Sequence, residues 1–140
     1  MKRLKQLVVL TTFAVLACAG LHGQNIDMRA AIPFDFHAGD RLMPAGEYVI
    51  HERGAWVILN DADGKASGAL MTFAASGRGP AQAQNARLEF NRYGSEYFLS
   101  SVWNSFTTDG RQVPATTRQK ELAKRGDVPV PATVALTSTK

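Results

Sequence analysis

Two histidines and one aspartate are the residues of this chain best suited to chemistry. Asp35 and His37 stand two positions apart, so an extended strand would point both side chains to the same face. His51 belongs to a later strand-like segment, and the three side chains could hold a metal ion if the two strands paired. The alternation of a strand with one solvent-exposed face also places polar residues at these positions, without any metal. A metal-assisted or carboxylate hydrolase that uses Asp35, His37 and His51 is therefore one of two hypotheses.

The other motifs that resemble reactive sites are incomplete. The segment 60–64 reads Asn-Asp-Ala-Asp-Gly, like part of a calcium-binding loop, but Leu59 and Leu70 stand where the first and last ligands belong. A hairpin turn accounts for this segment, because Asp and Gly supply turn hydrogen bonds and positive φ. No serine lies in a Gly-x-Ser-x-Gly motif or has a lysine three residues later. The absence of complete catalytic and calcium-binding motifs favours a protein that binds a partner without catalysis and without a cofactor.

The C-terminal part contains a cluster of basic residues. The pattern predicts a short helix from Thr117 to Arg125, which begins with a capping box at residues 116–119 and ends at Gly126. The basic side chains on it are Arg118, Lys120, Lys124 and Arg125. They could contact an anionic envelope polymer or lipid headgroups. The alternative is a solvated helix in which arginines pair with Glu121.

The N-terminus has the layout of a secretory signal peptide. Basic residues among the first five are followed by an apolar run from Leu7 to Ala19, and no acidic residue precedes Asp27. A run of about 13 apolar residues is shorter than the roughly 20 that a membrane-spanning helix needs. We therefore predict an exported chain, periplasmic or secreted, with no transmembrane span after the leader is removed.

The cleavage site of the signal peptide determines whether the mature protein is anchored to a membrane. Residues 17–19, Ala-Cys-Ala, fit the small-x-small rule and predict a signal peptide over residues 1–19, with cleavage as late as residue 23 as a variant. Residues 15–18, Val-Leu-Ala-Cys, also fit a bacterial lipoprotein box, in which Cys18 is acylated and becomes the first residue. This alternative makes the protein an outer-membrane lipoprotein, because two acyl signals give stable anchoring.

Length, composition and charge narrow the class of protein. The 140 residues are 45% hydrophobic and 20% charged, which is close to globular averages and leaves room for one domain. Three of the 16 lysines and arginines lie in the first five residues, so the rest of the chain has 13 against 12 acidic residues. A nucleic-acid-binding protein would keep a basic surface without its leader. We therefore expect no nucleic-acid partner, and the single cysteine allows no disulfide within the chain.

Short runs of β-branched and aromatic residues, separated by turn residues, predict a β domain over residues 26–113. In the run 31–37, Ile32, Phe34 and Phe36 alternate with polar residues, which predicts one strand with one buried face. Further strands are expected over residues 48–52, 55–59 and 66–74, and a long loop over 76–85.

The clearest local prediction is a hairpin with a two-residue turn at 94–95. This turn pairs Phe90 with Leu99 and Arg92 with Tyr97 and places both pairs on one face. The same alternation assigns most aromatic side chains to the core, namely Phe34, Phe36, Trp56, Phe90, Tyr97 and Trp103. Tyr93 and Phe98 have the opposite parity, which indicates a second buried face or an exposed contact patch.

Three groups of residues carry a resemblance to a known family. They are Ile32-Pro33-Phe34-x-Phe36-x-x-Gly39, Pro44-Ala45-Gly46-x-Tyr48, and Leu88-x-Phe90-x-Arg92-Tyr93-Gly94-x-x-Tyr97-Phe98-Leu99-x-x-x-Trp103. Together they resemble a family of small, exported, functionally uncharacterised bacterial proteins that occurs in many copies in soil bacteria, over about residues 28–125. The resemblance implies export and brings no activity, cofactor or catalytic residue with it.

These patterns predict an all-β fold, a small antiparallel β-sandwich or barrel of about six to seven strands with one short C-terminal helix. The expected parts are the β domain at 26–113, the helix at 114–126, and an extended or disordered tail at 127–140 that could add a strand. The leading hypothesis for function is an exported, non-catalytic binding or structural module of the cell envelope or secretome. Its expected partner is an envelope protein or polymer.

Overall fold

The structure is a computed structural model, and it describes residues 26–64, 67–75, 86–104 and 109–138. The predicted signal peptide, the alternative lipid attachment at Cys18 and the predicted loop at 76–85 lie outside these ranges and stay predictions. Within the described ranges, no helix combines the length and apolar character that a membrane crossing requires.

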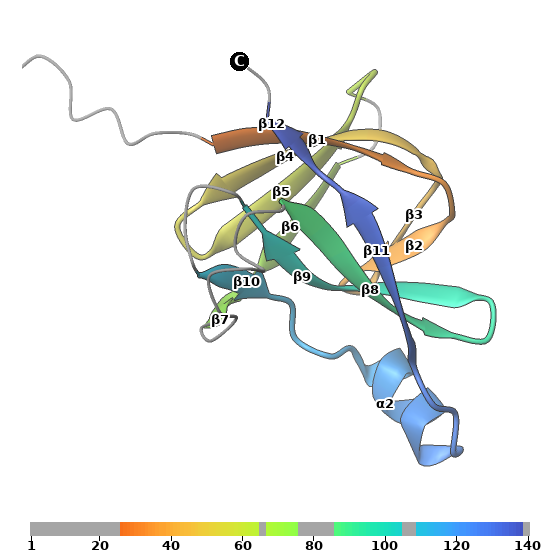
Figure 1. Cartoon of the computed structure of the whole chain (residues 1–140). Helices are drawn as coiled ribbons and strands as arrows, with labels where there is room; N and C mark the ends of the chain where they lie inside the picture. Colours follow the sequence, from red (N-terminus) through yellow and green to blue (C-terminus); the bar gives the residue numbers. More distant parts are fainter. Residues whose placement is uncertain (1–25, 65–66, 76–85, 105–108, 139–140) are drawn as a thin grey trace, which may run out of the picture.

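Five strands form the first sheet, here named sheet A, in the order β12-β1-β4-β5-β6 (Figure 1). All of its neighbouring pairs are antiparallel. The strands are β1 (Ile26–Ile32), β4 (Gly46–Arg53), β5 (Trp56–Asp61), β6 (Ser67–Met71) and β12 (Thr137–Ser138). The predicted turn at 60–64 is confirmed, because the Gly64 N–H donates to the Asp61 carbonyl oxygen at 3.0 Å.

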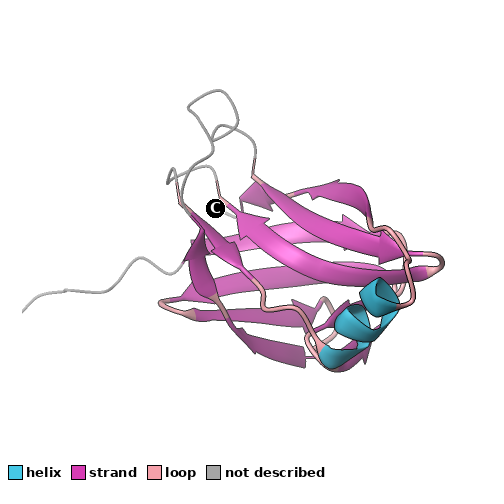
Figure 2. Ribbon diagram, turned by 90° about the horizontal axis from the view of Figure 1, so that it is seen from below, coloured by secondary structure: helices cyan, strands magenta, loops and turns pink. Residues whose placement is uncertain are grey.

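The second sheet, sheet B, has the order β11-β8-β9-β10-β7, and a parallel pairing of β2 with β9 attaches the β2–β3 hairpin. The strands are β2 (Phe36–Ala38), β3 (Arg41–Met43), β7 (Phe73–Ala75), β8 (Arg87–Tyr93), β9 (Glu96–Trp103), β10 (Gly110–Gln112) and β11 (Val130–Ala135). The two sheets pack across one core (Figure 2). The predicted all-β class with one short C-terminal helix is therefore confirmed, in its sandwich form.

The core lies between the two sheets and receives side chains from both. Sheet A contributes the inward face of β1, β4 and β5, and sheet B contributes the inward face of β8, β9 and the β2–β3 hairpin. The largest fully buried side chains are Met28, Ile32, Phe36, Met43, Tyr48, Ile50, Val57, Leu59, Leu88, Phe90, Phe98 and Leu99. All of them except Phe98 belong to one contiguous cluster.

The chain passes between the two sheets four times: in the turn from β3 to β4 and at three further corners. Pro33 follows β1 in sheet A, and the chain resumes in sheet B at Phe36, because proline has no N–H to donate to a ladder. Thr72 separates β6 from β7, and Leu136 separates β11 from β12. The single strands predicted over 31–37 and 66–74 are therefore wrong, since each run is divided between two sheets. These divisions explain why the described ranges contain more and shorter strands than expected.

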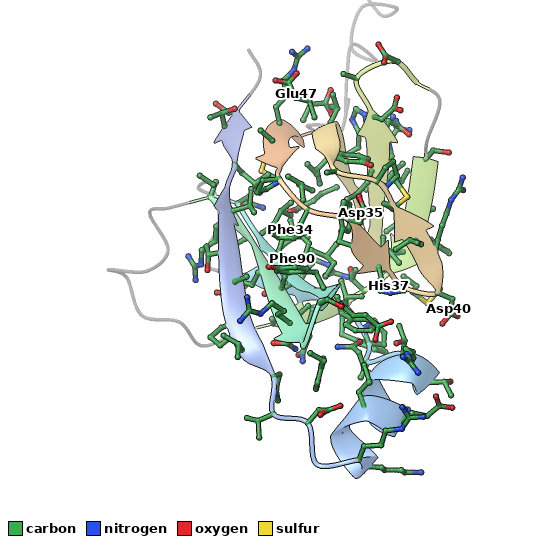
Figure 3. The ribbon with its side chains drawn as sticks, turned by 90° about the vertical axis from the view of Figure 1, so that its right-hand side faces the viewer. Phe34, Asp35, His37, Asp40, Glu47 and Phe90 are labelled. Atoms are coloured by element: carbon green, nitrogen blue, oxygen red, sulfur yellow. The ribbon has the colours of Figure 1, made fainter. Side chains whose placement is uncertain are left out.

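Aromatic rings fill the first corner (Figure 3). Phe34 stacks on Tyr97, with ring centroids 3.7 Å apart, and meets Phe90 edge-on at 5.0 Å. Phe36 makes edge-on contacts with Tyr48 and Phe90 at 5.4 and 5.5 Å. All five rings belong to the residue groups that carry the family resemblance, so these groups meet in space at the joint between the sheets.

The predicted hairpin has the predicted register, and a β-bulge follows it. Phe90 lies opposite Leu99, but Glu89 lies opposite Ser101, so Ser100 is an extra residue in β9. Every later side chain of β9 is turned to the face opposite to the one that simple alternation predicts. Val102 is fully buried in the core, whereas Trp103 belongs to the outer face of sheet B. Trp103 is buried as predicted, but it lies on the outer face of sheet B and outside the core cluster.

Two further aromatic predictions are decided by burial. Trp56 is 45% exposed at the start of β5, because Val57 and Leu59 are the side chains of that strand that point inward, so its assignment to the core is wrong. Phe98 is nearly fully buried on the outer face of sheet B and stacks on His37, with centroids 4.5 Å apart. The predicted second buried face is confirmed at Phe98, and Tyr93 meets its ring edge-on at 5.8 Å.

The C-terminal helix α2 (Thr117–Lys124) begins and ends as its sequence predicts. Thr116 and Gln119 form the reciprocal capping box, and Gly126 has a φ of +89° just after the helix. The helix lies at one end of the sandwich (Figure 2) and buries Leu122 and Gln119. The described part of the tail expected over 127–140 supplies two strands, because β11 pairs with β8 and β12 pairs with β1.

We predict that Val102→Ala lowers the free energy of unfolding by about 2 kcal/mol, because it removes two methyl groups from a filled core. Chemical denaturation of both proteins measures this difference. The control is Val130→Ala, at a valine that is 48% exposed on β11, which should change stability by less than about 0.5 kcal/mol. Equal small effects at both positions would mean that the bulge at Ser100 is absent and that Val102 faces solvent.

Candidate functional site

A row of side chains crosses five strands on the outer face of sheet B. Residues directly opposite one another in a sheet point to the same face, and the register aligns Thr133, Glu89, Ser101, Gln112 and Phe73 on β11, β8, β9, β10 and β7. A groove of about 540 Å³ lies along this row, and all of these residues except Phe73 line it. This volume is within the range of about 300–1,000 Å³ that is typical of ligand sites.

Glu89 is the charged residue in the lining of this groove, and its neighbours hold it in place. Arg87 Nε donates to Glu89 Oε1 at 3.0 Å, and the Ser101 hydroxyl donates to Glu89 Oε2 at 2.7 Å. The Ser100 hydroxyl donates to the Glu89 carbonyl oxygen at 2.9 Å. Hydrogen bonds to an ionised group are stronger than neutral ones. The carboxylate is therefore a fixed, charge-balanced part of the groove.

Trp103 forms one end of the groove floor. Its indole Nε1 donates to the Ser101 hydroxyl oxygen at 3.0 Å, and the Arg87 guanidinium lies 5.4 Å from its ring centroid. The ring also lies against Gly110, where a Cβ atom would come within 2.6 Å of it. Glycine at position 110 is therefore what allows the indole to approach β10 so closely. Only 6% of Trp103 stays exposed.

Three polar side chains of the lining have no hydrogen-bond partner in the part of the chain that the structure describes. They are Asn91 on β8, Gln112 on β10 and Thr133 on β11. Two amides and one hydroxyl present both donors and acceptors. Because they come from three strands around the groove, they can contact a ligand from several sides.

Asp35 has a structural role at the corner between β1 and β2. One of its carboxylate oxygens accepts a hydrogen bond from the Ala45 N–H at 2.8 Å. The Tyr48 hydroxyl donates to the Pro44 carbonyl oxygen in the same turn. The predicted metal ligand Asp35 is therefore engaged in holding the turn that leads into β4.

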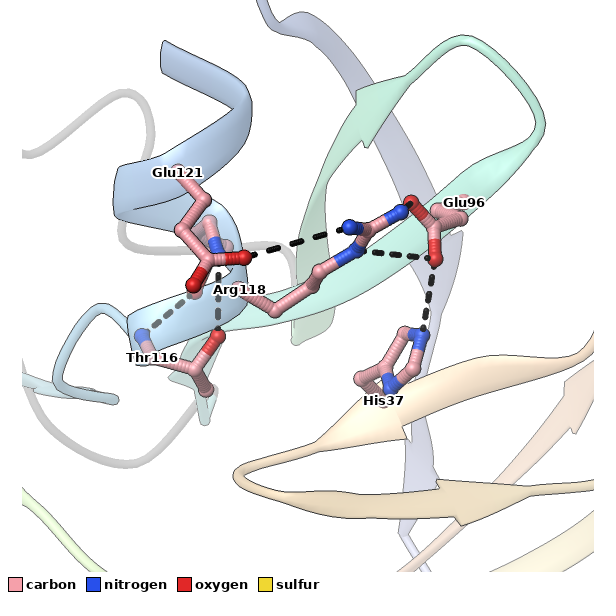
Figure 4. A network of polar contacts seen from close by, with 6 residues as sticks. His37, Glu96, Thr116, Arg118 and Glu121 are labelled. Atoms are coloured by element: carbon pink, nitrogen blue, oxygen red, sulfur yellow. Dashed lines mark hydrogen bonds and ion pairs between the residues drawn. The ribbon is translucent and has the colours of Figure 1, made fainter. Parts of the chain in front are cut away.

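His37 lies in a network of charged residues that reaches helix α2 (Figure 4). Its Nε2 is 3.8 Å from a carboxylate oxygen of Glu96, and its ring stacks on Phe98. Arg118 contacts the other oxygen of Glu96 at 3.1 Å and reaches Glu121 at 3.9 Å. This network links the β2–β3 hairpin, the β8–β9 hairpin and the first turn of the helix.

His51 lies on the other sheet, and its Nδ1 is 2.5 Å from a carboxylate oxygen of Asp27. The condition for the predicted metal site is not met, because β2 pairs with β3 and β9, whereas β4 pairs with β1 and β5. The structure therefore does not bring Asp35, His37 and His51 together. Among the described residues, no group of three His, Cys, Asp or Glu side chains is arranged to hold a metal ion.

The basic residues of the helix divide into two kinds. Arg118 is engaged by Glu96 and by Glu121, so the predicted pairing within the helix holds for this arginine. Lys120, Lys124 and Arg125 are exposed and have no ion pair within the described ranges. Contact of these residues with an anionic partner stays a prediction.

Glu52 is a half-buried carboxyl group that connects the two sheets. Asn104, just after β9, donates from Nδ2 to Glu52 Oε2 at 3.0 Å, while Glu52 Oε1 has no hydrogen bond within the described part of the chain. Burial raises the pKa of Glu52 above its usual value, and the Asn104 hydrogen bond and the charge of Arg111 offset this only in part. Arg111 is held by Thr72, to whose hydroxyl and carbonyl oxygens it donates at 2.8 and 2.9 Å.

Simple alternation of residues does not predict the groove, although the sequence contains a signal for it. Leu99 and Val102 are both apolar and three positions apart, with two serines between them. A regular strand would point these two residues to opposite faces, so their spacing indicates a bulge if both are buried. That inference would have moved Ser101 and Trp103 to the outer face.

No protein-family model, curated protein or solved structure matches this chain. The family resemblance of its three residue groups therefore stays a prediction.

We predict that Glu52→Gln stabilises the protein relative to wild type as the pH rises from 4 to 7.5. A carboxyl with a raised pKa in the folded state favours folding while protonated, and this contribution is lost as the pH rises through the folded-state pKa. Glutamine keeps the shape and carries no charge. Thermal unfolding of both proteins across this pH range measures the effect.

The matched control for this prediction is Glu47→Gln, at an exposed glutamate on the same strand. It should give no comparable gain at the higher pH. A constant difference between Glu52→Gln and wild type at all pH values would show that the Glu52 carboxyl is ionised equally easily in the folded and unfolded chains.

Proposed function

We propose that this protein is an exported, non-catalytic binding module of the cell envelope or secretome, and that it holds its ligand in the groove of sheet B. The row of polar side chains across β11, β8, β9 and β10 is the observation that carries this proposal. Binding sites are typically concave and contain a few polar groups that fix the orientation of a ligand. The groove has both properties.

The floor of the groove is rigid before any ligand arrives. Glu89, Ser101, Trp103 and Arg87 are joined by hydrogen bonds and by the contact of Arg87 with the indole. A site that is already ordered loses less conformational entropy on binding. The engaged carboxylate of Glu89 also supports binding over catalysis, because both of its oxygens already accept hydrogen bonds.

The export half of the proposal rests on the leader and is tested by the intact mass of the protein expressed in a Gram-negative host. A mature chain that begins at residue 20 or 24 would support a freely diffusing periplasmic or secreted module. A diacylated or triacylated Cys18 would support a membrane-tethered module. A chain that keeps residue 1 and stays in the cytoplasm would contradict export.

The binding half of the proposal is tested by blocking the groove with a large side chain. Thr133 is exposed on the edge strand β11 directly opposite Glu89, so Thr133→Trp should fill the groove and leave the fold intact. The assay is co-sedimentation of the purified protein with washed peptidoglycan sacculi, outer membranes and surface polysaccharide of its native bacterium. We expect wild type to be retained by at least one of these fractions and Thr133→Trp to be retained about fivefold less.

The matched control is Ala69→Trp, which adds the same bulk to an exposed position of β6 on sheet A. This variant should be retained as well as wild type. Equal retention of Thr133→Trp and wild type would show that the groove is not the binding site. If none of the fractions retains wild type, the proposal of an envelope ligand is contradicted.

A further inference from the structure

We infer that the ligand of the groove is a neutral polysaccharide whose sugar rings lie across the strands of sheet B from Thr133 to Phe73. This inference rests on the proposed function and names the chemical class that the site selects. Three observations point to it, namely the balanced charge of the groove, its open amide and hydroxyl groups, and an exposed aromatic ring just beyond the groove at the end of the row.

The charge of the groove disfavours ionic ligands. Glu89 is the acidic side chain of the lining, and Arg87 neutralises it at 3.0 Å. An anionic ligand would approach a carboxylate with no open cation among the described lining residues, and a cationic ligand would compete with an arginine that is already in place. Like-charge contacts and lost pairs are costly on binding. A neutral ligand avoids both costs.

The open polar groups of the lining suit hydroxyl groups, which both donate and accept hydrogen bonds. Asn91 and Gln112 each carry an amide with two donors and an acceptor, and Thr133 carries a hydroxyl. A ligand that presents only donors or only acceptors would leave part of this set unpaired, at a cost for each polar group that is buried without a partner. Sugars present many groups that do both.

Phe73 supplies an apolar surface at the end of the polar row. It lies opposite Gln112 across the β10–β7 pairing and is 61% exposed. The two faces of a sugar ring carry C–H groups as well as hydroxyl groups, so an open aromatic ring beside a line of polar side chains fits its amphipathic shape. A wholly polar ligand would make no favourable apolar contact with this ring.

Along the groove floor, the strand pairing disfavours an extended peptide as the ligand. Peptides commonly join a sheet by pairing with a free strand edge. β8 is paired on both sides by β11 and β9, and β10 is paired on both sides by β9 and β7. The groove floor therefore offers side chains rather than backbone groups, as recognition of sugar hydroxyls requires.

The test uses Trp103 as a reporter of binding. Trp56→Phe removes the second tryptophan at a position that is 45% exposed, which leaves the indole in the groove floor as the single source of tryptophan fluorescence. The probes are neutral hexasaccharides of α- and β-linked glucose, xylose, mannose and N-acetylglucosamine, with polygalacturonate as the anionic comparison. We expect saturable changes in emission with at least one neutral series and none with polygalacturonate.

Two substitutions in this background assign binding to the row. Phe73→Ala and Gln112→Ala should each raise the dissociation constant at least tenfold, because the first removes the apolar surface and the second removes an open amide. The matched controls are Leu42→Ala, at a leucine that is 62% exposed on β3, and Asn60→Ala on β5. Both controls should bind as the parent does. Thermal unfolding confirms that each variant is folded.

The outcomes separate this inference from the proposed function. Binding of polygalacturonate alone, or neutral binding that Phe73→Ala and Gln112→Ala leave unchanged, would overturn the inference. No binding of any probe, with envelope retention still lost in Thr133→Trp, would overturn the neutral sugar and keep the groove as a binding site. If no probe binds and Thr133→Trp is retained by the envelope fractions as well as wild type, the inference and the proposed function are both overturned.

Discussion

One extra residue in β9 decides which side chains face the core and which face the groove. No residue of β8 lies opposite Ser100 in the register, so Val102 turns inward beside Leu99, and Ser101 and Trp103 turn outward. Without this bulge, an indole would point into a core that is already filled, and a valine would stand in place of the polar floor. The packing of the sandwich and the chemistry of its outer face therefore depend on the same irregularity.

The groove also depends on how the chain closes the sandwich. Leu136 is buried at the corner between β11 and β12, and its N–H donates to the Ala86 carbonyl oxygen at 2.9 Å. This corner fixes β11 against β8, so the C-terminal segment becomes a wall of the groove. At the opposite side, Thr72 bonds to Ala55 and to Arg111 at the corner that leads into β7. Core packing in both sheets thus determines the position of both ends of the polar row.

The sequence predicts those features that depend on neighbouring residues. The register of the β8–β9 hairpin follows from a two-residue turn and alternating side chains, and the helix follows from its capping box and Gly126. Both are local, so tertiary contacts change them little. The groove depends on contacts between distant strands, and no local pattern specifies which strand lies next to which.

Particular residues explain the failed predictions. The alternation over 31–37 indicates one strand, but Pro33 is the point at which the chain leaves sheet A for sheet B. The tail is the opposite case, because the sequence predicts that it can add a strand, and it supplies β11, an edge strand of sheet B that tolerates Pro131. Asp35, His37 and His51 share suitable chemistry, but the strands that would have to pair to unite them lie in different sheets.

The central claim is that the outer face of sheet B holds the ligand, and the most direct measurement is a nuclear magnetic resonance titration of the isotope-labelled mature chain with solubilised envelope polysaccharide. The account predicts that the largest shifts occur in the side-chain amide signals of Asn91 and Gln112 and in the indole N–H signal of Trp103. Shifts confined to the Trp56 indole on sheet A, or to helix α2 around Lys120 and Lys124, would contradict it.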